Sequence, residues 1–122
     1  MRARRVRSLA ALLVFALVPL ANAFAGADSA ATPAAGKRER VRIEDNFYEP
    51  RELTVHRGDK VTWLWRGENS HNVTFIKVPR GASKKGADTR RTGHWTRTFW
   101  KRGLYKYVCT VHYGQRGSVE VR

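Results

Sequence analysis

The sequence predicts an all-β domain with the layout of a sandwich or a small barrel. Apolar and polar residues alternate in several short segments, which is typical of strands that bury one face. Turn residues such as Gly, Asn and Asp separate these segments about every 8 to 12 residues, as in small all-β domains. A helical period of 3.6 residues is found nowhere after the amino-terminal segment.

Seven segments are expected to be strands. Val41 and Ile43 alternate with charged residues, and Val61, Trp63 and Trp65 share one face of a β-branched and aromatic run. The other segments show the same alternation of apolar and polar residues. The expected strands are, in order, 40–44, 53–56, 61–65, 72–78, 95–100, 104–109 and 118–122.

The segments between these strands are expected to be turns and loops. Residues 46–50 combine Asn, Phe, Tyr, Glu and Pro and should turn the chain. Residues 79–93 are polar and basic, and we expect a loop without regular structure there. Because sandwich strands favour aromatic residues, the four tryptophans should pack in the core or on its flanks. They are Trp63, Trp65, Trp95 and Trp100.

The amino terminus predicts export. Residues 1–23 combine an arginine-rich start, a short apolar run and an Ala-Asn-Ala cleavage sequence, which is typical of a secretory signal peptide. The run is shorter than the roughly 20 residues that span a bilayer, so no membrane anchor is expected after cleavage. We expect 24–37 to be a disordered lead-in and 38–122 to be one folded domain, periplasmic or extracellular. The pair Arg4-Arg5 leaves a twin-arginine route open.

The chain is strongly basic. Its net charge is +14, and loss of the four arginines of the predicted signal peptide lowers this to +10. Such a charge favours partner proteins with an acidic surface. It also permits binding of an acidic polysaccharide. Nucleic acid is not an expected partner, because the chain is exported and has no aromatic-basic recognition motif.

The stretch 105–117 holds candidate metal ligands. Cys109 is the only cysteine, and His112 and Gln115 follow it at three and six positions. A lone cysteine in an exported protein needs burial, a metal or a partner cysteine. A thiolate beside an imidazole suits copper or zinc, and a second histidine with a weak axial donor would make the His₂Cys geometry of electron-transfer copper sites. His71 is the candidate for that histidine.

These residues also have plainer interpretations. A free cysteine is often only a packing residue, and a histidine three positions later can occur by chance. The remaining histidines, His56 and His94, are expected to be structural or exposed, because neither lies near another ligand type in the sequence.

Four stretches carry a family resemblance, namely 47–63, 70–73, 99–112 and 116–119. Together they resemble the small cupredoxins of the plastocyanin, amicyanin and pseudoazurin type, over about 41–122. The resemblance implies a Greek-key β-sandwich of about eight strands. It also implies one copper ion that cycles between Cu(I) and Cu(II).

The same resemblance implies the roles of site residues. His71, Cys109 and His112 would be the equatorial copper ligands. Asn72 would tie the two ligand segments together through Thr110, which fixes ligand orientation before the metal binds.

The chain departs from the family pattern at the axial position. Gln115 stands where the family commonly has methionine, and Met1, the only methionine, leaves with the signal peptide. An axial glutamine is known for such sites. The alternative is a Gln115 side chain that points to solvent, because Tyr113 replaces a proline often found after the second histidine.

The function that the resemblance implies is that of an exported, monomeric one-electron carrier between redox partner proteins, and not of an enzyme. A copper chaperone or scavenger would need the same ligands and stays open, as does a basic exported β-sandwich without metal. A copper oxidase or nitrite reductase is not expected. Their further copper sites need more histidines, often in His-x-His pairs, and this chain has four isolated ones.

Overall fold

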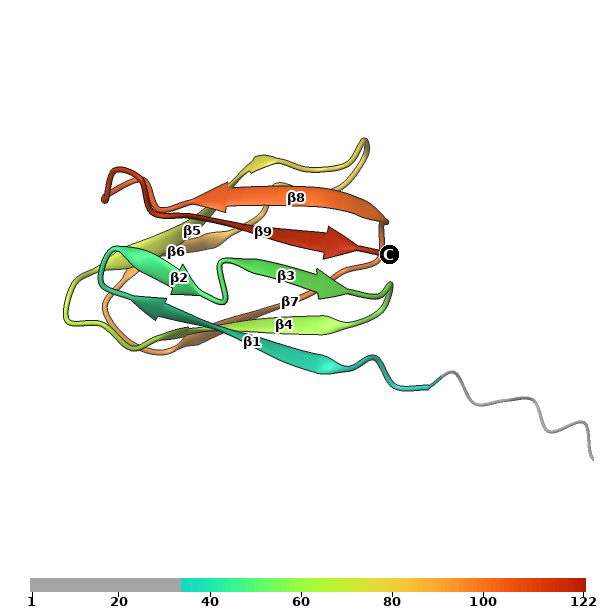
Figure 1. Ribbon diagram of the computed structural model, residues 1–122, viewed down its shortest axis with the longest axis horizontal. Coiled ribbons are helices and arrows are strands. Elements are labelled where there is room, and N and C mark those ends of the chain that lie inside the picture. The colour runs from blue at the N-terminus through green and yellow to red at the C-terminus, as the bar shows by residue number, and fades with distance from the viewer. Residues whose placement is uncertain (1–33) are drawn as a thin grey trace, which may run out of the picture. The chain divides into compact units, whose positions relative to one another are not determined.

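Nine strands follow one another along residues 34–122, the part of the chain that the computed structural model describes (Figure 1). The predicted signal peptide, 1–23, and most of the predicted lead-in, 24–37, lie outside the described residues. No helix in the described part is long and apolar enough to cross a membrane. The strands are β1 (Arg38–Glu44), β2 (Phe47–Glu49), β3 (Glu52–Val55), β4 (Lys60–Trp65), β5 (His71–Lys77), β6 (Ala87–Arg90), β7 (His94–Thr98), β8 (Gly103–Val108) and β9 (Arg116–Val121).

The strands form two sheets. One has four strands in the order β2-β1-β4-β7, and the other has five in the order β3-β9-β8-β5-β6. The pairs β1·β4 and β3·β9 are parallel, and the remaining neighbours are antiparallel. Figure 1 shows β1 and β4 in one layer and β3, β9 and β8 in the other. The predicted all-β sandwich is confirmed, with nine described strands where about eight were expected.

The core lies between the two sheets. Strand β4 buries every second side chain, as its sequence pattern predicts. Its central residue, Trp63, is fully buried and packs against the rings of Trp95 and Tyr107, with centroids 5.2 and 5.5 Å away. Trp100 is 65% exposed, so its predicted packing role is wrong. It follows the buried Phe99, and alternation beyond the end of β7 turns it outward.

The predicted turn at 46–50 is largely a strand. Residues Phe47–Glu49 form β2, which pairs with β1 from Arg42↔Glu49 to Glu44↔Phe47. The chain reverses just before it, where Asn46 has φ 72°. Asparagine tolerates this left-handed conformation better than most residues. The reversal is therefore tighter than the sequence suggested, and it projects Asp45 and Asn46 from the end of the sheet.

The predicted loop 79–93 also contains a strand. Residues Ala87–Arg90 form β6, which pairs with β5 at His71↔Arg90 and Val73↔Ala87. Only Ala87 of this strand is buried. An edge strand of this kind is held by backbone hydrogen bonds to its one neighbour, and its side chains carry no alternating pattern that a sequence could reveal.

Candidate metal centre

Strand ends and loops from distant parts of the sequence meet at one end of the sandwich. His71 is the first residue of β5, and Cys109 directly follows the last residue of β8. The antiparallel pairing of these strands sets Thr74 opposite Val108. The start of β5 therefore lies beside the end of β8, and loop 109–115 returns over this end toward β9.

His71 and Cys109 are buried side by side. They are 0% and 4% exposed, and His71 Nδ1 lies 3.8 Å from Cys109 Sγ. A tetrahedral ion with bonds of about 2.0 Å to nitrogen and about 2.3 Å to sulfur would hold these atoms about 3.5 Å apart. The two side chains are thus spaced much as two ligands of one ion would be.

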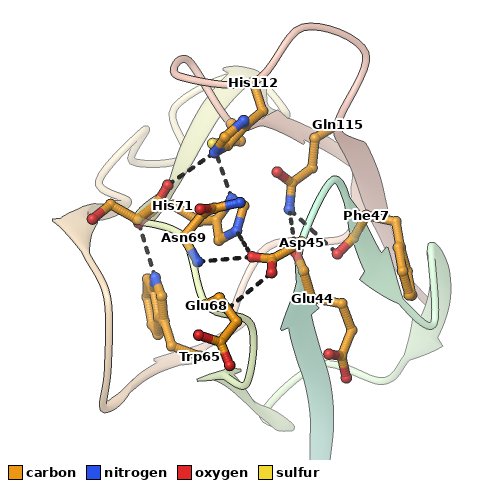
Figure 2. A network of polar contacts seen from close by, with 11 residues as sticks. Glu44, Asp45, Phe47, Trp65, Glu68, Asn69, His71, His112 and Gln115 are labelled. Atoms are coloured by element: carbon orange, nitrogen blue, oxygen red, sulfur yellow. Dashed lines mark hydrogen bonds and ion pairs between the residues drawn. The ribbon is translucent and has the colours of Figure 1, made fainter.

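His112 lies next to this pair and is half-buried. Its ring centroid is 4.5 Å from that of His71, and its Nε2 lies 3.1 Å from the carbonyl oxygen of Ser70 (Figure 2). Among residues 34–122, no three His, Cys, Asp or Glu side chains are grouped closely enough to enclose an ion. His112, the predicted third ligand, therefore lies next to His71 and Cys109, but the three side chains do not yet enclose a position for an ion.

Gln115 is buried with a fixed amide orientation. It is 1% exposed, so the alternative of a side chain that points to solvent is wrong. Its Nε2 donates to the carbonyl oxygens of Glu44 and Phe47, each at 3.3 Å, and these two acceptors identify the nitrogen. Its Oε1 is buried without a hydrogen-bond partner among the described residues. Figure 2 shows this oxygen on the side that faces the two histidines.

The backbone of the ligand loop is closed by its own hydrogen bonds. Cys109 N–H donates to the Gln115 carbonyl at 3.0 Å, and Gln115 N–H donates to the His112 carbonyl at 3.3 Å. Gly114 supplies a positive φ of 84° that few other residues adopt readily. These contacts hold the predicted ligands of this loop in one short turn.

Asn72 links the two ligand segments, as the resemblance implies. Its Nδ2 donates to Thr110 Oγ1 at 2.7 Å, and its Oδ1 accepts the Thr110 N–H at 3.0 Å. The same side chain donates to Thr89 Oγ1 and accepts from Thr74 Oγ1, both at 3.0 Å. The contact with Thr89 involves β6, which the sequence did not reveal.

Asp45 is a site residue that sequence reasoning missed. Its Oδ1 lies 3.0 Å from His71 Nε2, on the opposite side of the ring from the thiol. The hydrogen bonds from His71 and from the backbone N–H groups of Asn69 and Glu68 lower the pKa of Asp45 to about 2. The sequence around Asp45 predicted only a turn, so no spacing signal connected it to His71.

The other two histidines are both exposed, as expected. His56 follows β3, with its Nδ1 4.0 Å from Asp59 Oδ2. His94 begins β7 and stands opposite Leu64 of β4. Neither of them contributes to the described contacts around His71.

The donor types suit a soft or borderline metal ion. A thiolate with imidazoles selects copper or zinc over magnesium or calcium, and an amide oxygen is a known weak axial donor to trigonal copper. The buried Oε1 of Gln115 is the most informative atom, because an unsatisfied polar atom in the interior costs free energy unless a partner satisfies it. The residues present therefore fit a bound metal ion.

Comparisons with known proteins show which family the chain is similar to. Residues 37–122 match the copper binding proteins of the plastocyanin/azurin family. Amicyanin from Paracoccus denitrificans is 33% identical over 129 residues, an alignment that covers 98% of this chain and 97% of the amicyanin. The structure of a pseudoazurin from Sinorhizobium meliltoi is similar with a TM-score of 0.64 and 26% identity, over 70% of this chain and 74% of the pseudoazurin.

A larger protein shares the fold. A copper-containing nitrite reductase from Thermus scotoductus SA-01 is similar with a TM-score of 0.61 and 22% identity. The match covers 70% of this chain and 22% of the reductase chain. At this identity the likeness is one of fold alone.

Proposed function

Because the chain belongs to the plastocyanin/azurin family of copper-binding proteins, we propose that it holds one copper ion through His71, Cys109 and His112, with Gln115 as a weaker axial ligand. The observation that carries this proposal is the Oε1 atom of Gln115, which is buried without a hydrogen-bond partner among residues 34–122 and faces the two histidines (Figure 2). His112, whose ring lies beside that of His71, would complete the ligand set.

Copper supplies a one-electron couple, Cu(II)/Cu(I), when it is bound. The chain's residues supply a rigid cage for it. Asn72 ties the segment of His71 to the segment of Cys109, and the backbone bonds within 109–115 fix the loop. Ligands held in one arrangement for both oxidation states need little rearrangement when the electron moves, which favours rapid transfer.

The function that this site supports best is that of a one-electron carrier between redox partner proteins. An enzyme of the nitrite reductase kind would need a further copper site. The histidines left over, His56 and His94, are exposed and contribute nothing to the described site. A copper chaperone or scavenger remains the alternative, because it would use the same ligands.

The surface beside His112 has the character of a contact area for a partner. Val111 is 51% exposed and the Tyr113 side chain is fully exposed. These apolar side chains next to a half-buried ligand would let a partner approach the copper closely, and Gly114 lies in the same loop. The excess of basic residues favours a partner whose surface is acidic. We expect the carrier to act as a monomer, exported to the periplasm or the outside of the cell.

The experiment that tests this function compares copper-loaded wild type with histidine variants. His71→Ala and His112→Ala should each lose the visible band of the Cu(II) form, while the matched controls His56→Ala and His94→Ala keep it. The wild type should also pass through repeated cycles of reduction and oxidation without releasing copper. Release of copper in each cycle would favour the chaperone, and equal spectra in all four variants would reject the ligand set.

A further inference from the structure

Asp45 stands behind His71 on the side away from the thiol. We propose that Asp45 is a positioning residue for His71, which holds the imidazole as the Nε2–H tautomer and so directs the Nδ1 lone pair toward Cys109 Sγ. The proposal rests on the proposed function in so far as His71 is a copper ligand. The effect of Asp45 on the His71 tautomer can be measured separately in the metal-free protein.

The carboxylate is itself fixed in place. Its Oδ1 accepts the Asn69 N–H and its Oδ2 accepts the Glu68 N–H, each at 2.9 Å, while Oδ1 also lies 3.0 Å from His71 Nε2 (Figure 2). A Cβ at Gly67 would overlap this carboxylate, so glycine at that position leaves the room that Asp45 occupies. The Asp45 carboxylate is thus a hydrogen-bond acceptor that is held in one orientation.

A carboxylate with no proton can only accept a hydrogen bond. The nitrogen that faces Asp45 must therefore carry the ring proton, and the other nitrogen, Nδ1, keeps its lone pair for a metal. His71 is fully buried, so no exposed surface is left through which water could replace this partner. Partners of this kind fix the tautomer and orientation of ligand histidines and increase their basicity.

The turn that carries Asp45 also orients a second side chain of the site. The carbonyl oxygens of Glu44 and Phe47, on either side of the turn, accept the Gln115 amide N–H groups. The β1–β2 turn therefore directs Nδ1 of His71 toward Cys109 and Oε1 of Gln115 toward the two histidines (Figure 2). It does so from outside the ligand loop.

Stronger electron donation by His71 should shift the reduction potential of the copper in one direction. An imidazole that donates more strongly, with a negative charge behind it, stabilises Cu(II) more than Cu(I). Asp45 should therefore lower the reduction potential. Loss of its charge should raise the potential while Cys109 stays a ligand.

The first test uses the metal-free protein. Nitrogen-15 NMR of the histidine rings should show His71 as the Nε2–H tautomer in wild type, and Asp45→Ala should convert it to a mixture of tautomers or to Nδ1–H. Glu44→Gln is the matched control, because it removes a negative charge from the same turn. The Glu44 carboxylate points away from His71 and lies 3.7 Å from Arg42. An Nδ1–H tautomer in wild type, or an unchanged Nε2–H tautomer in Asp45→Ala, would overturn the proposal.

The second test uses the copper-loaded protein and Asp45→Asn, which keeps a hydrogen-bond acceptor without the charge. Cu(II) affinity should fall about tenfold, the lower end of the 10–100-fold loss that removal of such a partner causes, because the asparagine still accepts a hydrogen bond. If Cu(I) affinity is unchanged, each tenfold loss raises the potential by about 59 mV. Asp59→Asn is the control, since Asp59 caps a different turn by accepting the N–H groups of Lys37 and His56.

The two tests separate this proposal from the proposed function. A wild type that binds no copper would reject the ligand set, and the tautomer would still decide the role of Asp45. A wild type that binds copper, with equal potentials in Asp45→Asn and Asp59→Asn, would reject the role of Asp45 alone. If Asp45→Ala does not fold, Asp45→Asn replaces it in the NMR test. His71 should then show a weakened preference for the Nε2–H tautomer.

Discussion

Nδ1 of His71 lies 3.8 Å from Sγ of Cys109, although 38 positions separate the two residues in the sequence. The contact exists because β5 and β8 are antiparallel neighbours whose ends meet at one end of the sandwich. The core, and not the metal, therefore brings these two side chains together. This predicts that the metal-free protein is already folded, with most of the site in place.

Replacement of the Gln115 side chain should change the reduction potential. An amide oxygen is a harder donor than a thioether sulfur and favours Cu(II). Gln115→Met should therefore raise the potential by at least about 59 mV, which corresponds to a tenfold change in relative affinity. Voltammetry of wild type, Gln115→Met and Gln115→Leu is the measurement. Equal potentials in all three proteins would show that Gln115 is not an axial ligand.

Asn72 should be worth more to stability than any one of its partners. Asn72→Ala removes both hydrogen bonds that join the two segments through Thr110, each worth about 0.5–1.5 kcal/mol, and should therefore cost about 1–3 kcal/mol. Thr89→Ala removes a single hydrogen bond to the same amide and should cost about 0.5–1.5 kcal/mol. Urea unfolding of the metal-free proteins compares them. Equal losses of unfolding free energy would contradict the linking role of Asn72.

Two buried tyrosines should respond differently to loss of the hydroxyl. Tyr48 donates to the Asn72 carbonyl at 2.6 Å, so Tyr48→Phe should lower the unfolding free energy by about 1–3 kcal/mol. Within residues 34–122 the Tyr107 hydroxyl is buried and has no hydrogen-bond partner. Tyr107→Phe should therefore be neutral or stabilising. Thermal unfolding of both variants tests the pair, and a large loss in Tyr107→Phe would contradict this packing.

The basic charge should control encounters with charged electron acceptors. Oxidation of the reduced protein by the anionic hexacyanoferrate(III) should slow as salt rises, because salt screens attraction over about 10 Å at 0.1 M. Oxidation by a cationic cobalt or ruthenium complex should show the opposite trend. Stopped-flow rates at several salt concentrations are the measurement. Rates that do not depend on ionic strength would show that the basic charge does not assist partner binding.

Much of the fold was predictable because its central strands bury one face. The alternation of apolar and polar residues in β4, β8 and β9 is visible in the sequence, and all three are interior strands of their sheets. Strands β2 and β6 were missed for a physical reason. They are short strands at sheet edges, and backbone pairing with a single neighbour holds them without an apolar pattern.

The sequence also located the candidate ligands that the structure brings near one another. Cys109, His112 and Gln115 lie in one short segment, and the Ser-His-Asn sequence at His71 carried the resemblance. Asp45 could not be found in this way, because its contact with His71 depends on the tight β1–β2 turn that the sequence did not reveal. Its role follows only from the relative positions of two turns, 45–46 and 67–69.

The visible spectrum of the copper-loaded protein shows whether Cys109 is a thiolate ligand of copper. Wild type with one equivalent of Cu(II) should become intensely coloured, because a thiolate bound to Cu(II) allows strong charge transfer from sulfur to metal. Cys109→Ser should bind copper without that band. A wild type that takes up Cu(II) with only weak visible absorption, or a Cys109→Ser variant that keeps the intense band, would contradict the account.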